Sequence, residues 1–311
     1  MKDQAESIYL IDASIYIFQS HFSSNIKCVD NKGNDLSALY GFTQFLIQFI
    51  RRTKPRYLGV AHDGSLITGF RHQLCESYKS NRELPDENLA MQLKGCLEIS
   101  AILGLPAFTS KTYEADDIIG TISHNLRKEI KRTTLRILTK DKDLAQLLVA
   151  DDDCLWDYSA NRRRYRGDIS TEFGVLPEYF PDYLGLVGDS VDCIKGVPGI
   201  GPVKAKVLLK EFGCLEKIYE NLDKILGLPI SGAKRLASSL HNNRELAFLS
   251  KRLATIVCSI KGCEESFGAV SLDSLQVKPI KQVEFDRFLR QYDFKENERK
   301  ILERIISSIT L

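Results

Sequence analysis

The sequence predicts an α/β protein with a mainly parallel sheet, followed by an all-helical domain. In the N-terminal half, apolar β-type runs alternate with apolar patterns of helical period, as in a sheet covered by helices. From about residue 176, short helical patterns are separated by glycines instead. We therefore expect two domains, residues 1–175 and 176–311.

The first domain contains three clear strand patterns. "IYLID" (8–12) and "YLGVAHD" (57–63) each end in an aspartate, and "ALYGFTQFLIQFIRR" between them has helical spacing. "LRILTKDKD" (135–143) is a third strand pattern ending in acids, and it follows a helix expected to begin at "EADD" (114–117). Ligands of parallel sheets gather at the carboxyl ends of the strands, where these acids fall.

The second domain begins with "YFPDYLGLVGD" and continues through "GPVKAKVLLKEFG" and "GAKRLASSLHNNRELAFLSKRLAT". The basic stretch "SANRRRYRGDISTEFG" (159–174) is either a linker or a hairpin edge, and its arginines are expected in a solvated loop. One near-repeat occurs, "GVPGIGPVKAKVLL" at 196 and "GLPISGAKRLASSL" at 227.

Composition indicates a cytoplasmic protein without a membrane partner. Of 311 residues, 43% are hydrophobic and 27% charged, as in ordinary globular proteins. The N-terminus lacks a signal-peptide pattern, and no apolar run approaches the roughly 18 residues that a membrane helix needs. The eight cysteines include no C-x-x-C pair, so we expect reduced thiols rather than zinc ligands.

Nine acids form four groups: Asp12; Asp63; Glu114, Asp116 and Asp117; and Asp141 and Asp143 with Asp189 and Asp192. Oxygen ligands without His or Cys partners suit Mg²⁺ or Mn²⁺. Nine carboxylates exceed the needs of one ion, and two ions roughly 3.5 to 4 Å apart serve phosphodiester hydrolysis. Without the nine, 32 of the 41 acidic residues remain against 43 basic ones, a balance that suits a polyanionic substrate.

Each acid also has a simpler interpretation. Acids in the first turn of a helix stabilise it through the helix dipole, which accounts for one or two of the acids in "EADD". A third adds repulsion unless a cation lies among them. His62, beside Asp63, is expected to be a packed strand residue.

The glycine-rich stretch "GVPGIGPVKAKVLLKEFG" has the form of a helix-hairpin-helix. Gly196, Gly199 and Gly201 allow a tight hairpin whose N–H groups can approach a phosphate, and Lys204 and Lys206 add charge. Such a hairpin grips the nucleic-acid backbone without reading bases. The alternative is a glycine-capped turn with solvated lysines.

A second basic stretch, "FRHQLCESYKSNRELPDE" (70–87), surrounds an aromatic residue. Arg71, Lys79 and Arg82 lie around Tyr78, a combination that can bind phosphates and stack a base. If the stretch is a helix, Lys79 and Arg82 share a face and can point at one phosphate. A solvated helix face would have a similar pattern.

Together, these motifs resemble the 5′ nuclease (flap endonuclease) family, in particular the 5′-3′ exonuclease domain of bacterial DNA polymerase I and its stand-alone relatives. The resemblance rests on "LIDASIYIF", "FRHQLCESYKSNRELPDE", "YEADDIIGTI", "TKDKDLAQLL" and "YLGLVGDSVDCIKGVPGIGPVKA". It implies a PIN-like or Rossmann-like nuclease core, a helical arch at about residues 70–100, and a duplex-gripping helix-hairpin-helix. The implied activity is metal-dependent hydrolysis of DNA at 5′ flaps and 5′ ends, in replication and repair.

The resemblance also implies roles for single residues. Asp12, Asp63 and Asp116 would hold a first metal, Asp116, Asp141, Asp143 and Asp189 a second, and Glu114, Asp117 and Asp192 would act nearby or through waters. Lys79 and Arg82 match the family's "YKxxR", where the lysine approaches the scissile phosphate. The hairpin at 196–201 would bind K⁺ on its carbonyls. The expected partner is DNA with a 5′ flap, nick or 5′ end, bound by a monomer at the bacterial nucleoid.

Three positions depart from the family pattern: Gln19 replaces a common arginine, Lys140 a common glycine, and Lys195 stands in "DCIKG" where "DNIPG" is usual. None removes an expected metal ligand. Two alternatives remain open: a DNA-binding protein that has lost turnover, and a related RNA-processing nuclease.

Overall fold

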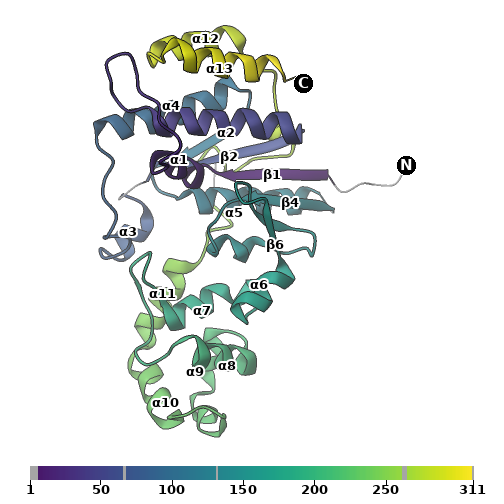
Figure 1. The fold of residues 1–311 in the computed structure, drawn as a ribbon. Coiled ribbons are helices and arrows are strands. Elements are labelled where there is room, and N and C mark those ends of the chain that lie inside the picture. The colour runs from purple at the N-terminus through teal and green to yellow at the C-terminus, as the bar shows by residue number, and fades with distance from the viewer. Residues whose placement is uncertain (1–5, 66–67, 131, 261–264, 310–311) are drawn as a thin grey trace. The chain divides into compact units, whose positions relative to one another are not determined.

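The computed structural model describes residues 6–65, 68–130, 132–260 and 265–309 (Figure 1). The chain packs into two compact units. The first comprises residues 1–66, 84–140 and 258–311, and the second residues 67–83 and 141–257. Both units are therefore built from segments that are distant in the sequence.

A parallel sheet forms the centre of the first unit. Its strand order is β3-β2-β1-β4, with every neighbouring pair parallel. The strands are β1 (Glu6–Asp12), β2 (Tyr57–Asp63), β3 (Ala107–Ser110) and β4 (Thr133–Leu138). The strands predicted at 8–12 and 57–63 are confirmed, while the third ends at Leu138, before its acids. Strand β3, only four residues long, was not predicted because its pattern is too short to recognise.

Helices cover both faces of this sheet (Figure 1). The helices of this part of the chain are α1 (Ala13–His21), α2 (Ser37–Thr53), α4 (Glu87–Ile102) and α5 (Ala115–Glu129). Helix α2 buries Phe42, Leu46 and Phe49 completely, on the apolar stripe expected from its spacing. Helix α5 lies on the other face and buries Ile118 and Ile122.

The C-terminal segment returns to the first unit, which departs from the predicted domains 1–175 and 176–311. It contains η4 (Asp273–Leu275), α12 (Gln282–Gln291) and α13 (Glu296–Ser307). The N–H groups of Lys278 and Lys281 donate to the carbonyls of Gly104 and Ile102 at 2.9 and 3.0 Å. Helix α12 buries Phe285 and Phe288. An amphipathic pattern specifies a buried face but not the element that covers it, so the sequence did not indicate this return.

The second unit is mainly helical. Its helices and 3₁₀ turns are α3 (Phe70–Leu74), η1 (Asp143–Leu147), α6 (Arg166–Phe173), η2 (Pro177–Tyr179), α7 (Phe180–Val187), α8 (Pro202–Phe212), α9 (Leu215–Glu220), η3 (Leu222–Gly227), α10 (Ala233–Asn242) and α11 (Arg244–Ala254). Strands β5 (Cys154–Asp157) and β6 (Arg162–Tyr165) form an antiparallel hairpin, the second of the two interpretations considered for the basic stretch.

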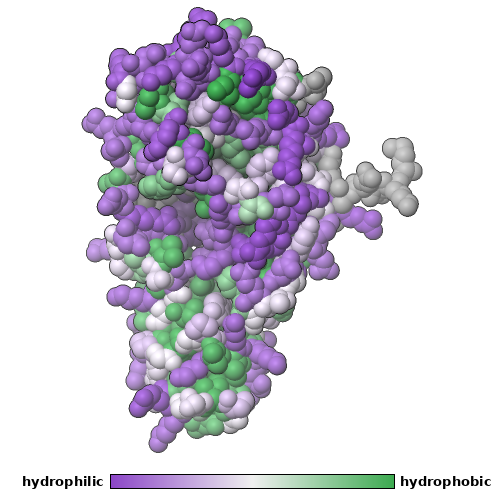
Figure 2. Space-filling model, viewed as in Figure 1, coloured by the Kyte–Doolittle hydropathy of each residue, from purple (hydrophilic) through white to green (hydrophobic). Residues whose placement is uncertain are grey.

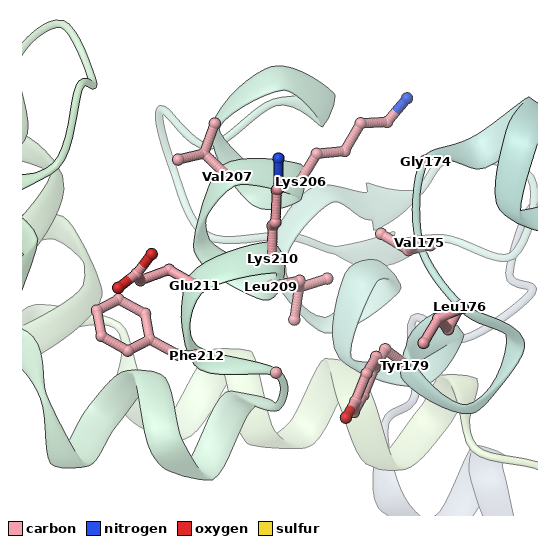
Figure 3. A pocket seen from close by; sticks show the side chains of 11 residues that line it. Gly174, Val175, Leu176, Tyr179, Lys206, Val207, Leu209, Lys210, Glu211 and Phe212 are labelled. Atoms are coloured by element: carbon pink, nitrogen blue, oxygen red, sulfur yellow. The ribbon is translucent and has the colours of Figure 1, made fainter.

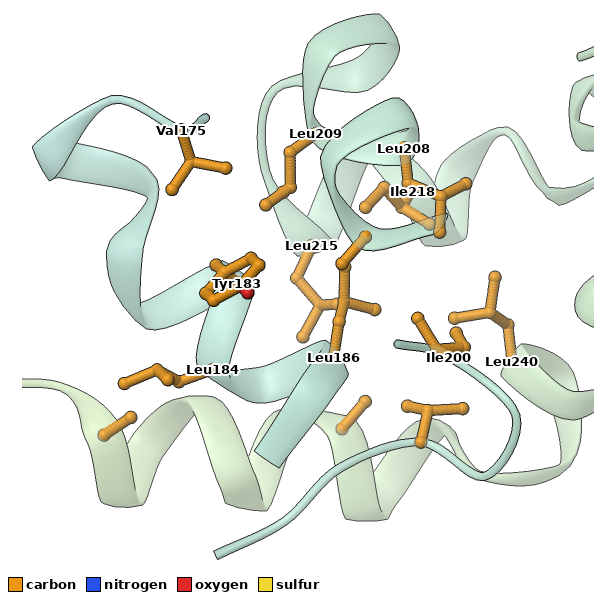
Figure 4. Close-up of a cluster of buried hydrophobic side chains, with 14 of the residues drawn as sticks. Val175, Tyr183, Leu184, Leu186, Ile200, Leu208, Leu209, Leu215, Ile218 and Leu240 are labelled. Atoms are coloured by element: carbon orange, nitrogen blue, oxygen red, sulfur yellow. The ribbon is translucent and has the colours of Figure 1, made fainter. Parts of the chain in front are cut away.

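One hydrophobic core holds these short helices together (Figure 4). Leu186 of α7, Leu208 of α8, Leu215 and Ile218 of α9 and Leu240 of α10 are almost fully buried in it. Short helices are marginal in isolation, so their stability comes from this shared apolar burial. The unit thus provides a rigid frame for the loops that join the helices.

The stretch expected to form a helical arch is helical only in part. Helix α3 ends at Leu74, residues 76–81 form turns, and α4 begins at Glu87. Helix α4 packs against α2 and α12 and buries Cys96 and Ile99. Residues 87–102 are therefore part of the packed body of the first unit.

Hydrophilic side chains cover most of the molecular face in Figure 2, with hydrophobic ones in scattered patches. Within the described ranges, no helix combines the length and apolar character needed to cross a membrane. The seven cysteines among the described residues are free thiols, as expected from their spacing.

Candidate active site

Two acids stand at the carboxyl ends of neighbouring strands in the first unit. Asp12 ends β1, is 4% exposed, and accepts a 2.9 Å hydrogen bond from the Thr139 hydroxyl. Asp63 ends β2, and its two oxygens accept hydrogen bonds at 2.7 Å from the Ser14 hydroxyl and from the Ala115 N–H. The Ala115 contact joins Asp63 to the start of α5, so the strand end and the helix start meet here.

The acids at the start of α5 divide between two roles. Glu114 is the N-cap residue, and its side chain accepts from the N–H of Asp117 while the Asp117 carboxylate accepts from the N–H of Glu114 at 3.1 Å. This reciprocal capping box satisfies N–H groups that a helix start leaves without partners. The capping interpretation is therefore correct for Glu114 and Asp117, and Asp116 is the half-buried acid outside the box.

The second unit has its own acidic cluster, organised around a lysine that was not singled out from the sequence. The Lys142 ammonium lies 3.0 Å from Oδ1 of Asp143 and 2.5 Å from Oδ2 of Asp189. Asp143 begins η1, and its N–H donates to the Asp141 carboxylate at 2.8 Å. Two buried carboxylates from distant segments thus share one cation, since Lys142 and Asp189 are 47 residues apart. The signal available in the sequence was a cation placed between two acids in "DKD".

Burial and charge shift the pKa values of this cluster in opposite directions. Burial, with the neighbouring Asp141 charge, raises the pKa of Asp143 to about 7 even though Lys142 opposes the shift. Burial also acts to raise the pKa of Asp189, but the hydrogen bond and charge of Lys142 outweigh it and the pKa is lowered. In this cluster Asp189 therefore readily stays charged, whereas Asp143 is costly to ionise without a further cation.

Lys79 and Arg82 both contact Asp192, but not from a helix. The Asp192 carboxylate lies 3.7 Å from Nζ of Lys79 and 2.8 Å from a guanidinium nitrogen of Arg82. Lys79 has a left-handed backbone with φ of 50° in the turn at 76–81, so the helical spacing assumed for the pair is wrong. Its N–H donates to the Asp192 carbonyl at 3.0 Å, and this contact holds the turn to the loop that follows Asp189. The turn at 76–81 therefore brings Lys79 and Arg82 together at the Asp192 carboxylate.

Two other residues of the same basic stretch lie inside the second unit. Arg71 is 3% exposed, and its guanidinium donates at 2.8 Å to the carbonyls of Leu253 and Thr255. Tyr78 is 2% exposed and belongs to the hydrophobic core. The predicted contacts of these two side chains with DNA are therefore not supported, because both have structural roles that keep them from the surface.

The glycine-rich hairpin connects α7 and α8 as the motif predicts. Gly199 has φ of 78°, which favours glycine, and Gly201 is the N-cap residue of α8. Gly196 approaches the backbone of Val187 so closely that a Cβ atom would lie 2.3 Å from its carbonyl carbon. The Lys204 ammonium donates to the Gly199 carbonyl at 2.9 Å, which places its charge at the turn.

Lys206 has a different environment from Lys204. Its stem crosses Gly174, where an added Cβ would lie 2.9 Å from the Lys206 Cδ. The near-repeat at 227 also leads into a helix, α10, which begins after Gly232 at φ of 75°.

His62 is a packed strand residue, as predicted. It is 5% exposed, lies 3.2 Å from the Ser100 hydroxyl through Nε2, and meets the ring of Phe42 edge-on. Burial lowers its pKa to about 3, so the ring is neutral. This environment suits a core residue.

The donor set fits hard divalent cations. Within the described ranges, no three His, Cys, Asp or Glu side chains already stand together at metal-binding geometry. The candidate acids are nevertheless oxygen donors, and most of them are buried. Asp143 and Asp189 share the Lys142 ammonium, which shows that this pair of carboxylates can surround a positive charge. Ser14 and Thr139, which orient Asp63 and Asp12, were not identified from the sequence because hydroxyl residues carry no distinctive pattern.

Comparison with known families identifies two matching segments. Residues 7–176 match "5′-3′ exonuclease, N-terminal resolvase-like domain", and residues 175–282 match "5′-3′ exonuclease, C-terminal SAM fold". A 5′-3′ exonuclease of Buchnera aphidicola subsp. Baizongia pistaciae is 34% identical over 304 residues, covering 95% of this chain and 94% of that protein. DNA polymerase I of Caldicellulosiruptor bescii is 34% identical over 83% of this chain and 29% of its own length.

Solved structures share the fold. The T5 D15 protein co-crystallised with metal ions has a TM-score of 0.64 at 20% identity, covering 92% of this chain and 98% of its own. The catalytic core of Rad2 in complex with DNA substrate has a TM-score of 0.60 at 14% identity, over 98% of this chain and 93% of its own. The predicted fold class, a mostly parallel sheet with helices and a second helical domain, is confirmed.

Proposed function

The chain belongs to the 5′-3′ exonuclease family of nucleases, and on this premise we propose that it is a structure-selective 5′ nuclease that hydrolyses DNA at 5′ flaps, nicks and 5′ ends. The observation that carries the proposal is the acidic cluster in which the buried carboxylates of Asp143 and Asp189 share the Lys142 ammonium. Buried carboxylates of this kind are costly unless a cation binds them, and phosphodiester hydrolysis needs cations beside the reacting phosphate.

We assign the metal ligands by combining this cluster with the family motifs. By the family motifs, Asp12, Asp63 and Asp116 would hold one ion, and Asp116, Asp141, Asp143 and Asp189 would hold another. When bound, Mg²⁺ or Mn²⁺ would activate water for attack on phosphorus and offset charge on the leaving oxygen. The metal ions co-crystallised with the T5 D15 protein support the use of cations.

The protein's own residues position these ligands. Thr139 and Ser14 orient Asp12 and Asp63, and the capping box of Glu114 and Asp117 fixes the start of α5. Glu114 and Asp117 therefore contribute to the site through the helix start. No side-chain nucleophile is needed, since water is the attacking group.

Lys79 and Arg82 are assigned to the scissile phosphate. Asp192 holds both cations, and a phosphate competes well for a guanidinium and an ammonium because it offers several strong acceptors. Substrate would thus exchange the Asp192 carboxylate for the phosphate. Asp192 is then a positioning residue for the two cations.

The helix-hairpin-helix would grip the DNA backbone. The start of α8 presents N–H groups after Gly201, and Lys204 adds charge at Gly199, a combination suited to a phosphate. Carbonyls of the 196–201 turn would hold K⁺ beside that phosphate. We place this activity on the chromosomal DNA of a bacterial cytoplasm, in replication and repair, with the enzyme acting as a monomer.

Cleavage of a labelled double-flap DNA in Mg²⁺ tests the proposal. A ladder of short products from the 5′ end, together with a single flap-length product, is expected, and both should disappear in Asp141→Ala and Asp189→Ala while DNA binding in Ca²⁺ persists. Near wild-type cleavage by these variants would refute the metal assignment. Binding without cleavage by the unmodified chain would favour a DNA-binding protein, and cleavage of RNA alone an RNA-processing nuclease.

A further inference from the structure

A cavity of about 550 Å³ lies within the second unit, between the segment that follows α6 and the C-terminal half of α8 (Figure 3). Neither the nine acids nor the hairpin glycines line it. Its volume is in the range of pockets that enclose a small ligand or a few side chains of a peptide. The cavity therefore offers a binding site separate from the proposed catalytic machinery.

The cavity has an apolar lining. Val175, Leu176 and Tyr179 come from one side and Leu209 from α8, and their side chains converge in Figure 3. Leu176 is 44% exposed, so its side chain is accessible at the mouth of the cavity. A partner that covered this surface would gain apolar burial of roughly 25 cal/mol per Å².

The rim of the cavity is basic. Lys206 and Lys210 are one helical turn apart on α8, and Figure 3 shows both ammonium groups extending to the same side of the apolar lining. The stem of Lys206 passes over Gly174, whose lack of a side chain leaves room for it. The one acid that lines the cavity, Glu211, belongs to the next position of α8.

We propose that this cavity docks an acidic peptide segment of a partner protein, with an apolar or aromatic side chain in the cavity and carboxylates on Lys206 and Lys210. The charge of the rim and the chemistry of the lining both match such a segment. A nucleotide base matches less well, because its polar edges would face a lining whose only side-chain hydroxyl is that of Tyr179.

The location on α8 allows DNA and peptide to bind together. Helix α8 begins at Pro202, beside the hairpin, and Lys210 lies eight positions later, roughly 12 Å along the axis at 1.5 Å per residue. Lys206, four positions and roughly 6 Å from Pro202, belongs both to the cavity rim and to the basic end of the hairpin, so the carboxylate on Lys210 is the peptide contact that leaves the start of α8 free for a phosphate. The site would thus attach the protein to a partner without blocking the hairpin, and the inference stands whether or not the chain cleaves flaps.

Fluorescence anisotropy of a labelled peptide, three aspartates followed by leucine and a C-terminal phenylalanine, titrated with the full chain, tests the proposal. Saturable binding is expected, weakened about tenfold by Lys210→Glu, which reverses a rim charge, and by Leu176→Asp, which places a carboxylate at the apolar mouth. The matched control is Lys217→Glu, at an exposed lysine of α9 outside the cavity, and it should change the dissociation constant by less than about twofold.

Three results would overturn the proposal. The first is equal affinity for a peptide whose leucine and phenylalanine are replaced by serine. The second is an equal loss of peptide affinity in Lys217→Glu and Lys210→Glu. The third is displacement of the peptide by a thymidine pentanucleotide that binds the same site more tightly. The first two would mean unspecific attraction between charges, and the third a nucleic-acid site. Thermal melts of the variants establish that each is folded, and flap cleavage by Lys210→Glu should equal that of the unmodified chain.

Discussion

Replacing Asp143 by asparagine should change how the stability of the metal-free protein depends on pH. The pKa of Asp143 is raised from 3.8 to about 7 by burial and by Asp141, so folding favours its protonated form. Its contribution to stability is fully present below about pH 4 and is lost as the pH rises to about 7. In Asp143→Asn the amide keeps the shape of the carboxyl group without titrating, so the variant should not lose this contribution.

The expected magnitude follows from the same shift. Each pKa unit corresponds to about 1.36 kcal/mol, so two units between about pH 5 and pH 7 set a ceiling of about 3 kcal/mol. The attraction of Lys142, 3.0 Å away, acts on the ionised carboxylate and is already included in the pKa of about 7. We therefore expect the free energy of unfolding of the unmodified chain to fall by roughly 1 to 3 kcal/mol relative to Asp143→Asn.

Urea denaturation in EDTA at about pH 5, 6, 7 and 8 measures this difference. Asp223→Asn, at an exposed position of η3, is the matched control and should track the unmodified chain. Mg²⁺ should restore stability to the unmodified chain most strongly at high pH, because a cation offsets the buried charge. A difference that stays constant within about 0.5 kcal/mol across the series would refute the burial argument.

Four further substitutions test other parts of the structure. Lys79→Ala should lower the single-turnover rate of 5′-flap cleavage by a factor on the order of 10² to 10³, while the dissociation constant for DNA in Ca²⁺ changes little. Arg82→Ala should lower the rate less. Weaker DNA binding at an unchanged rate would contradict the assignment of these residues to the phosphate. Lys204→Ala should weaken duplex binding for all sequences alike and flatten its salt dependence, so a loss confined to one sequence would argue against backbone recognition. Gly104→Ala should destabilise the fold by about 2 kcal/mol or more in urea denaturation, since φ is 75° and a Cβ would lie 2.1 Å from the Lys278 carbonyl oxygen; an unchanged midpoint would mean that this loop relaxes.

The position of each strand-end acid could be predicted because it depends on local pattern. Apolar runs that stop at Asp12 and Asp63 specify strands with their ends at one edge of a parallel sheet. The glycines of the hairpin could also be predicted from the sequence, since the left-handed backbone at Gly199 favours a residue without a side chain. In both cases a few adjacent residues carry the whole signal.

The roles of several charged residues could not be predicted, because their partners are remote in sequence. Lys142 was overlooked since its second partner, Asp189, is 47 residues away. Arg71 was interpreted as a phosphate ligand, but its guanidinium meets the Leu253 carbonyl 182 residues away. A basic residue has the same pattern in the sequence whether it faces solvent, DNA or a buried carbonyl, and only packing distinguishes these environments.

By itself, the sequence determined the strands and helices that depend on periodicity, the family, and the acids that stand at strand ends and helix starts. Tertiary structure alone decided that Arg71 meets the Leu253 carbonyl, that Tyr78 lies in a core, and that the last helices return to the first unit. The physical reason is that hydrogen bonds within a turn or helix form between residues a few positions apart, so their residue types are visible in order. Burial and ion pairing depend on which distant segments the hydrophobic effect brings together, and that choice is made by the whole chain.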